Sequence, residues 1–256
     1  MKLLSSAQQL IFLLSMSSEQ QSSSPAAPTP TPTPTPTACS IFVASSTDGY
    51  ICDKNNSVDW LRDVHKSHPM PEGDDGGFTQ YVNSVDAIIM GRKTYETVLS
   101  FKEWPYGDKP LYVLSRTPEK VTIPRTLVGD SVKTISGTAG PGREFCDPKS
   151  VLEKVAKEIT VTHTTANIAN GAASASSNNT NPNPNLTIHV YIDGGQCIRS
   201  FMDANLIQNV TITVVPVTLG ENGGIPLFTK EQKDRLQKVS STTMTNGFVQ
   251  TNYKVL

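Results

Sequence analysis

Short, continuous apolar runs, each closed by a turn, constrain the fold of this chain more than any other sequence feature. Ala87–Met90 (AIIM), Leu111–Leu114 (LYVL) and Thr187–Ile192 (TIHVYI) are typical of buried strands. Thr94–Phe101 and Cys197–Ala204, which follow two of these runs, space their apolar residues as a helix does. Strands that alternate with helices predict an α/β fold with a mainly parallel central sheet flanked by helices.

Other segments extend this pattern. Ser40–Ser46 and Val210–Val217 favour strands, and Phe78–Ser84 favours a helix. Asp147-Pro148 places a capping residue before a first-turn proline, which predicts that a helix starts there. The last 20 residues resemble an antiparallel hairpin, with Asn246-Gly247 as a two-residue turn.

Two low-complexity tracts interrupt the pattern. Residues 1–37 are rich in Ser and Gln and end in Pro-Thr repeats, so we expect a disordered tail. Residues from about 160 to 186 are rich in Ala, Asn, Ser and Thr, so we expect a disordered insert. The sequence therefore predicts one domain over residues 38–256.

The near-zero net charge and the lack of long apolar runs argue against some classes of binding partner. The chain has 256 residues with 22 Lys and Arg against 23 Asp and Glu, so it carries no basic field for nucleic acid. No run of about 18 apolar residues exists, so we expect no membrane span.

The cysteines favour reduced thiols. Cys39, Cys52, Cys146 and Cys197 form no C-x-x-C pair and no cluster with zinc-ligand spacing, so no metal is expected. We therefore expect a cytoplasmic protein. The N-terminal segment resembles a signal peptide only faintly, and secretion or an organelle stays an alternative.

Three junctions between a strand and the segment that follows it carry residues suited to phosphate. Gly91 permits a tight turn, and Arg92 can form two hydrogen bonds with a phosphate at the start of the next helix. Ser115 and Arg116 close the second strand, where ligands bind in open α/β sheets. The alternatives are an ordinary turn and a solvated arginine.

The third junction is Asp193-Gly194-Gly195-Gln196, between a strand and a helix. Two glycines let a phosphate approach the backbone, and the helix N-terminus supplies partial positive charge. The run matches neither common nucleotide fingerprint, so a plain turn is the alternative.

Together these motifs resemble a known superfamily. IIMGRKTYE, LYVLSR and VYIDGG, in this order, are similar to the dihydrofolate reductase-like proteins. The opening VASSTDGYICDKNNSVDWL and the later VVPVTLGENGGIPLF resemble one branch of it, the reductase domain of the bifunctional riboflavin-biosynthesis deaminase-reductase and its stand-alone relatives. The resemblance covers residues from about 39 to 256 without the insert.

The resemblance implies NADPH as cofactor and a small-molecule heterocyclic substrate as partner, and it leaves a homodimer as an open alternative. It places the nicotinamide near residues 44–51 and, beside the substrate, Asp48 and Trp60 as catalytic candidates, although Asp48-Gly49 also suits a plain turn. Arg92 would favour the 2′-phosphate. The residues that the resemblance assigns to the cofactor are Gly91, Arg92, Thr94, Ser115, Arg116, Gly194, Gly195, Gln196 and Cys197.

Three functions stay open. The first is an NADPH-dependent reductase of a phosphoribosylamino-pyrimidine, whose ribose becomes a ribityl chain. The second is dihydrofolate reductase, which needs a buried carboxylate that Asp63 or a neighbour would have to supply, although Asp63 also suits a solvated helix face. The third is a non-catalytic nucleotide-binding protein. Zinc deaminase chemistry is not expected, because the chain has no H-x-E and no P-C-x-x-C.

Overall fold

A computed structural model describes residues 37–136, 147–169 and 187–256 of the chain. Residues 1–36 of the expected tail and residues 170–186 of the expected insert lie outside this description. Thr37, assigned to the tail from the sequence, is the first residue of strand β1. Residues Pro34–Leu256 form one compact unit.

The described residues alternate between strands and helices along most of the chain. The strands are β1 Thr37–Ser45, β2 Ala87–Gly91, β3 Leu111–Ser115, β4 Val132–Ser136, β5 Ile188–Asp193, β6 Ile207–Val214, β7 Leu236–Thr243 and β8 Val249–Val255. The helices are α2 Asp59–Ser67, α3 Phe78–Ser84, α4 Arg92–Ser100, α5 Arg125–Val128, α6 Pro148–Ala169, α7 Gly195–Asp203 and α8 Lys230–Asp234, with short 3₁₀ turns η1 Pro118–Lys120 and η2 Gly220–Asn222.

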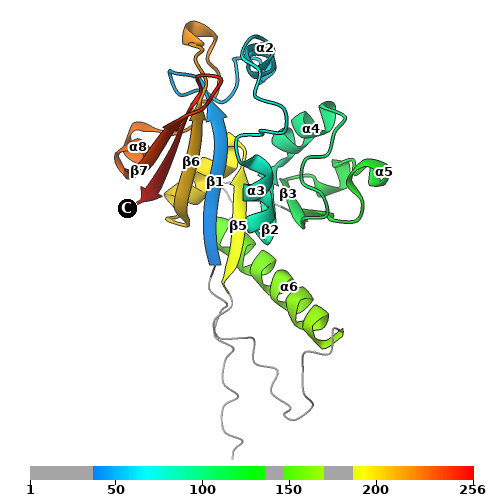
Figure 1. Cartoon of the computed structure of the whole chain (residues 1–256). Helices are drawn as coiled ribbons and strands as arrows, with labels where there is room; N and C mark the ends of the chain where they lie inside the picture. The colour runs from blue at the N-terminus through cyan, green and yellow to red at the C-terminus, as the bar shows by residue number, and fades with distance from the viewer. Residues whose placement is uncertain (1–36, 137–146, 170–186) are drawn as a thin grey trace, which may run out of the picture. The chain divides into compact units, whose positions relative to one another are not determined.

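Within the described ranges the strands form one eight-stranded sheet in the order β4-β3-β2-β5-β1-β6-β8-β7. Each neighbouring pair from β4 to β6 is parallel, and β8 is antiparallel to both β6 and β7. In Figure 1 the arrow of β1 points toward α2, so this end of the sheet is the carboxyl end of the parallel strands. The predicted α/β class, with a mainly parallel sheet and a C-terminal hairpin, is confirmed.

Helices cover both faces of the sheet because successive side chains of a strand point to opposite faces. Ile88 and Met90 of β2 belong to the apolar cluster that includes Tyr95 of α4. Ala87 and Ile89 of the same strand belong to the second cluster, which is built with α6 and α7. A strand buried on both faces reads as a continuous apolar run, which is why its sequence shows no alternation.

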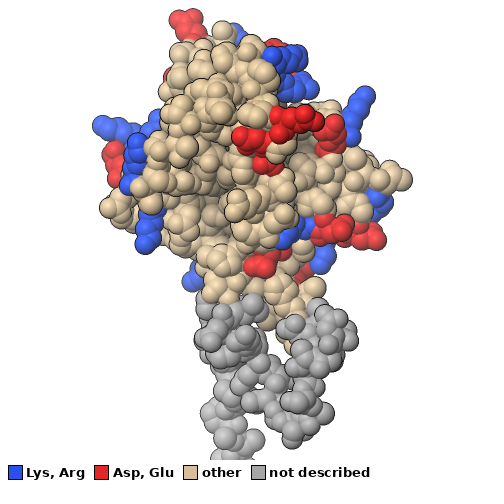
Figure 2. All heavy atoms as spheres, in the orientation of Figure 1, with Lys and Arg blue, Asp and Glu red and all other residues tan. Residues whose placement is uncertain are grey.

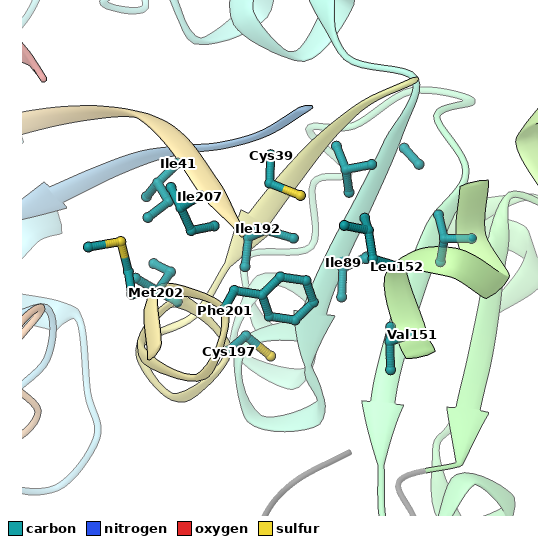
Figure 3. Packing of buried hydrophobic residues seen from close by; sticks show 14 of the residues in the cluster. Cys39, Ile41, Ile89, Val151, Leu152, Ile192, Cys197, Phe201, Met202 and Ile207 are labelled. Atoms are coloured by element: carbon teal, nitrogen blue, oxygen red, sulfur yellow. The ribbon is translucent and has the colours of Figure 1, made fainter. Parts of the chain in front are cut away.

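The cluster under α6 and α7 is the larger of the two. Figure 3 shows the ring of Phe201, from α7, pointing toward Ile89 of β2 and Leu152 of α6. Phe201 is 1% exposed and Ile89 is fully buried. This packing fixes the start of α7 beneath the carboxyl end of β5.

Helix α6 is longer than the sequence predicts. It continues through Ala169, so residues 160–169 are helical and the start of the expected disordered insert at about 160 is wrong. Threonine hydroxyls return hydrogen bonds to carbonyls four residues earlier, as Thr162 Oγ1 does to Glu158 O at 3.1 Å. Buried Ile159 and the Lys133–Glu158 ion pair, at 2.9 Å, hold this part of the helix to the sheet.

The C-terminal hairpin closes by a longer loop than the predicted two-residue turn. The backbone N–H of Gly247 donates to Met244 O at 2.9 Å, and the N–H of Met244 donates to Phe248 O at 2.7 Å. Three residues therefore lie in the loop, and its last residue, Gly247, has a φ of 85°. This geometry is a type I turn followed by a bulge that favours glycine.

The described residues include no helix long and apolar enough to cross a bilayer. On the face drawn in Figure 2, basic and acidic side chains of the described residues are interspersed. This face therefore shows no continuous basic surface.

Candidate active site

The candidate site lies at the carboxyl ends of three adjacent strands. Strand β2 pairs with β3 on one side and with β5 on the other, so their last residues meet at one edge of the sheet. Gly91, Ser115 and Asp193 end these three strands. Open α/β sheets bind ligands at this edge.

A cavity of about 810 Å³ opens at this edge. It is in the size range of pockets that hold a small molecule or cofactor. The residues that the sequence assigns to the cofactor all line it, and these are Gly91, Arg92, Thr94, Ser115, Arg116, Gly194, Gly195, Gln196 and Cys197. The structure thus brings three separate junctions together, while cofactor binding by these residues stays a prediction.

Two helix N-termini open into the cavity without a side-chain cap. Gly91 is the N-cap of α4 and Gly194 is the N-cap of α7, and neither offers an oxygen to the first-turn N–H groups. Both helices have nine residues, long enough for a helix dipole. Uncapped N–H groups at two helix ends suit the paired phosphates of a dinucleotide.

Glycine is required at position 194 for two reasons. Its φ of +84° disfavours any side chain, and a Cβ there would lie 2.1 Å from Oγ1 of Thr94. The turn between β5 and α7 therefore packs directly on the first turn of α4. A ligand can reach the backbone of both helices only because this contact is so close.

Three cations line the same end of the cavity, namely Arg92, Lys93 and Arg116. Arg92 lies 3.6 Å from Glu96, one turn along α4, in a partly exposed ion pair. Such a pair is weak in water, so the guanidinium can turn to a phosphate at low cost. The residues present fit a group with several phosphates.

Apolar and aromatic side chains form much of the remaining cavity wall. They are Phe42, Val43, Ala44, Leu61, Phe78, Phe101, Tyr191 and Ile51, of which Ile51 packs against Gly195 at the start of α7. Ile51 and Leu61 come from the loop after β1 and from α2, which lie over the sheet edge in Figure 1. Flat apolar walls suit heterocyclic rings and exclude water from a reacting centre.

Asp193 is the one carboxylate that lines this cavity among the described residues. Its Oδ1 accepts a hydrogen bond from the backbone N–H of Gly194 at 2.7 Å, and its Oδ2 accepts one from the Tyr106 hydroxyl at 3.3 Å. Burial raises the pKa of Asp193 because the charged form loses its hydration. The Asp193 carboxyl group therefore loses its proton at a higher pH than an exposed aspartic acid does.

Tyrosines surround this carboxyl group. The Tyr191 hydroxyl donates to the carbonyl of Phe42 at 2.8 Å, and Tyr81 shares a hydrogen bond with Ser40 at 2.8 Å. Burial and the nearby Asp193 raise the pKa of Tyr106 well above its ordinary value. The Tyr106 hydroxyl thus keeps its proton and donates it in the hydrogen bond to Asp193.

Asp48, a catalytic candidate from the sequence, does not line the cavity. Its Oδ1 accepts from Ser46 Oγ at 2.6 Å, and its Oδ2 accepts from the Gly220 N–H at 2.8 Å. Hydrogen bonds to the ionised form, first from Ser46, lower the pKa of Asp48. The carboxylate ties the loop after β1 to the segment around Gly220, and this connection continues where Ile51 N donates to Ile225 O at 3.0 Å.

Trp60, the other catalytic candidate, also lies outside the cavity wall. It is on α2 beside Leu61, which does line the cavity, and its buried Nε1 has no hydrogen-bond partner in the structure. Asp63 lies on the exposed side of α2, 2.9 Å from Lys66. Asp63 is therefore a solvated helix-face residue and not a buried carboxylate.

Sequence reasoning missed the residues around Asp193. Asp193 itself had a local signal, since it lies between a buried strand and a glycine pair. Tyr106 had none, because it belongs to the irregular segment between α4 and β3 and reaches the site only through the fold. Lys93 and Thr117 also line the cavity, next to residues that the motifs did identify.

A mainly parallel sheet with two uncapped helix N-termini, three cations and a buried carboxyl group at its carboxyl edge is typical of dinucleotide-binding reductase domains. The model of the RibD C-terminal domain family matches residues 186–250, which include β5 and α7. The structure of a putative riboflavin biosynthesis protein from Shewanella sp. PV-4 is 32% identical, with a TM-score of 0.56, and the match covers 86% of this chain and 99% of that one. The chain belongs to the family of RibD-type, riboflavin biosynthesis reductase-like proteins, as its motifs predict.

Two further relatives show how widely this architecture occurs. The uncharacterized protein YwjB of Bacillus subtilis (strain 168) is 27% identical over 216 residues, which are 83% of this chain and 95% of that protein. The diaminohydroxyphosphoribosylaminopyrimidine deaminase/5-amino-6-(5-phosphoribosylamino)uracil reductase of Thermotoga maritima is 13% identical with a TM-score of 0.54, and the match covers 87% of this chain and 57% of that one. At that identity the second likeness shows the fold alone.

Proposed function

We propose that this chain is an NADPH-dependent oxidoreductase that reduces a pyrimidine-type heterocyclic compound, as in riboflavin biosynthesis. The observation that carries the proposal is the single cavity of about 810 Å³, in which phosphate-type junctions and the Asp193 carboxyl group face the same space. The family relationship supports a reductase, and the pathway of the named relatives makes a phosphoribosylamino-pyrimidine the first acceptor to test.

Different residues of the cavity would bind the cofactor phosphates and orient the acceptor. The N-termini of α4 and α7, with Arg92 and Arg116, would hold the phosphates, and Arg92 would select a 2′-phosphate. When bound, NADPH supplies a hydride to the acceptor carbon. The apolar and aromatic side chains of the wall, such as Phe42 and Phe78, would orient the acceptor and keep water out.

Asp193 would supply the proton that balances this hydride. Reduction of a C=N or C=O bond places the hydride on carbon and a proton on nitrogen or oxygen. A buried carboxyl group with a raised pKa, hydrogen-bonded at Oδ2 by Tyr106, keeps its proton to a higher pH than an exposed aspartic acid does and can donate it. Asp193 then recovers a proton from solvent.

Dihydrofolate reductase is not proposed, because Asp63 is exposed and ion-paired on α2. Nothing in the site favours a non-catalytic protein either, since the buried carboxyl group costs stability and lies where chemistry would occur.

The test measures binding and turnover separately. NADPH binding is followed by nicotinamide fluorescence, and turnover by loss of nicotinamide absorbance with the pyrimidine acceptor, with NADH for comparison. We expect Arg92→Ala to weaken NADPH binding by about tenfold or more and to change NADH binding little. Arg125→Ala, which removes an exposed arginine of α5 outside the cavity, is the matched control. A chain that binds no NADPH at micromolar concentration contradicts the proposed function.

A further inference from the structure

Tyr106 reaches the site from a part of the chain that no motif covers. It lies between α4 and β3, lines the cavity, and its hydroxyl donates a hydrogen bond to Asp193 Oδ2 at 3.3 Å. This is a long bond for a hydroxyl on a carboxylate, and hydrogen bonds at a reacting group often shorten in the complex with substrate. Oδ1 of the same carboxyl group accepts the Gly194 N–H at 2.7 Å. Two different donors therefore orient the two oxygens of Asp193.

The ring of Tyr106 is held in place by aromatic neighbours and by the backbone around it. It is 4% exposed, and its centroid lies 5.2 Å from that of Trp104 and 6.1 Å from that of Phe78 on α3. The indole N–H of Trp104 donates to Gly107 O at 3.0 Å, and the backbone N–H of Lys109 donates to Tyr106 O at 3.2 Å. A side chain locked by packing presents its hydroxyl at a fixed point.

Tyrosines are the titratable groups that surround the Asp193 carboxyl group. Besides Tyr106, they are Tyr191 of β5 itself and Tyr81 of α3. On the neighbouring strand β2, the sheet partner of Asp193 is the uncharged Met90. Burial raises the pKa of Asp193, whereas hydrogen bonds, from a backbone N–H and then from Tyr106, lower it.

The hydroxyls of the other two tyrosines are bonded elsewhere. Tyr191 donates its one hydroxyl proton to Phe42 O at 2.8 Å, and the Tyr81 hydroxyl is hydrogen-bonded to Ser40 at 2.8 Å. The Tyr106 hydroxyl is thus the one of the three whose proton points at Asp193.

The cations of the cavity do not take over this contact. Arg92 and Lys93 of α4 and Arg116 after β3 line the same cavity. None of these three is among the groups that shift the pKa of Asp193. The orientation of the carboxyl group therefore depends on Gly194 and Tyr106.

We propose that Tyr106 is the positioning residue of Asp193, and that its hydroxyl holds the carboxyl group in the orientation from which it gives its proton to the acceptor. The inference rests on the proposed function and deepens it, because it adds a residue that acts through Asp193. As the hydride reaches the acceptor carbon, the O–H bond of Asp193 breaks and an N–H or O–H bond forms on the acceptor. Tyr106 keeps its own proton and stabilises the carboxylate that remains.

This role predicts the direction in which the pH dependence changes. A hydrogen bond to the ionised carboxylate favours the charged form, so removal of the Tyr106 hydroxyl should raise the pKa of Asp193. A merely structural loss would admit water to the carboxyl group and lower its pKa, because burial is what raises it. The two roles therefore shift the pH dependence of turnover in opposite directions.

Tyr106→Phe tests the role, because it keeps the ring and removes the hydroxyl. Single-turnover rates are measured across pH for the full chain with saturating NADPH and the phosphoribosylamino-pyrimidine acceptor. The rate should fall as pH rises through the pKa of the proton donor Asp193. We expect the variant to move this fall to higher pH and to lower the rate on the low-pH plateau by about tenfold. A fall that stays in place or moves to lower pH overturns the proposal.

Tyr112→Phe is the matched control. Tyr112 is 1% exposed, and its hydroxyl donates to Glu158 Oε2 at 3.1 Å, outside the cavity. The change removes the same group from the same kind of bond, so the rate should stay within about twofold at every pH. Equal effects of the two variants would mean that Tyr106 does not act through Asp193.

Unfolding of the chain without ligand gives a readout that does not depend on turnover. The cost of Tyr106→Phe in unfolding free energy should grow as pH rises through the pKa of Asp193, since the hydrogen bond is stronger to the ionised carboxylate. In the Asp193→Asn background the same change should cost the same at every pH. A cost independent of pH in both backgrounds contradicts the hydrogen bond.

Binding and turnover separate the two levels of the argument. If NADPH does not bind or the acceptor is not reduced, the proposed function is wrong, and the inference that depends on it is wrong too. If the acceptor is reduced and Tyr106→Phe behaves like Tyr112→Phe, the proposed function stands and the positioning role alone is wrong.

Discussion

At the scale of single residues, Asp193 combines a cost to stability with a chemical role. The unfolded chain releases the Asp193 proton near the ordinary pKa of about 3.9, whereas burial raises the pKa in the folded chain. Between these two pKa values the folded state binds more protons than the unfolded state, so stability falls as pH rises through that window. Below about pH 3.9 both states are protonated and the loss is absent.

Asp193→Asn should therefore stabilise the protein and inactivate it. The gain in unfolding free energy over the wild type should grow from about pH 4 upward and level off above the raised pKa of Asp193. The value of kcat should fall by about 10²-fold or more, with NADPH affinity little changed. Thermal unfolding across pH and single-turnover kinetics measure both effects.

Asp63→Asn is the matched control, because it removes the same charge from an exposed position on α2. It should leave kcat within about twofold and give no gain in stability that grows with pH. If Asp193→Asn behaves like this control, Asp193 neither bears a raised pKa nor transfers a proton.

At the scale of elements, the contact between the start of α4 and the turn before α7 brings the two helix N-termini together in the cavity wall. Gly194→Ala introduces a Cβ 2.1 Å from Thr94 Oγ1, at a φ of +84°. Strain at positive φ costs about 1–2 kcal/mol, and the clash adds about 1–3 kcal/mol. We expect a loss of about 2–5 kcal/mol in unfolding free energy, together with a loss of NADPH binding.

Gly247→Ala separates backbone strain from the clash. Gly247 has a φ of +85° in the hairpin loop, and a Cβ there meets nothing within 4 Å. It should cost about 1–2 kcal/mol in chemical denaturation and leave NADPH binding intact. Equal losses in the two variants would mean that the contact with Thr94 contributes nothing.

Helix α6 allows a second comparison at this scale. Ile159 is 3% exposed and Val161 is 58% exposed, two residues apart in the same helix. Ile159→Ala should cost about 2–5 kcal/mol in unfolding free energy, because it opens a cavity under the sheet. Val161→Ala should change it by about 0.5 kcal/mol or less. Similar values for both would show that α6 does not pack on the sheet as described.

The sequence predicts those elements whose signals are local. The apolar runs of β2, β3 and β5 and their turns specify the α/β class, and they also identify Gly91, Arg92 and Gly194 as cavity residues. The end of α6 could not be predicted from composition, since its threonine-rich half is held by contacts such as Lys133 to Glu158, 25 residues apart in the chain. Propensity is a weak guide where tertiary contacts decide.

At the scale of the whole molecule, the site depends on which segments the topology brings together. Asp193 ends β5 and Tyr106 precedes β3, so their hydrogen bond joins residues 87 positions apart. No spacing in the sequence encodes such a contact, so Tyr106 could not be predicted. Asp48 and Trp60 were placed near the substrate by the family resemblance, and neither lines the cavity.

The topology also predicts which end of the chain can be removed. The compact unit begins at Pro34, and Phe42 is the first of the described residues that line the cavity. Deletion of residues 1–33 should therefore change the unfolding free energy by about 0.5 kcal/mol or less and leave NADPH binding and acceptor turnover unchanged. Deletion of residues 1–41 is the contrast, because it removes Cys39 and Ile41, both buried in the centre of the sheet between β5 and β6, and should abolish cooperative unfolding. Chemical denaturation and nicotinamide fluorescence measure both variants, and a loss of binding in the shorter deletion would show that the first residues contribute to the site.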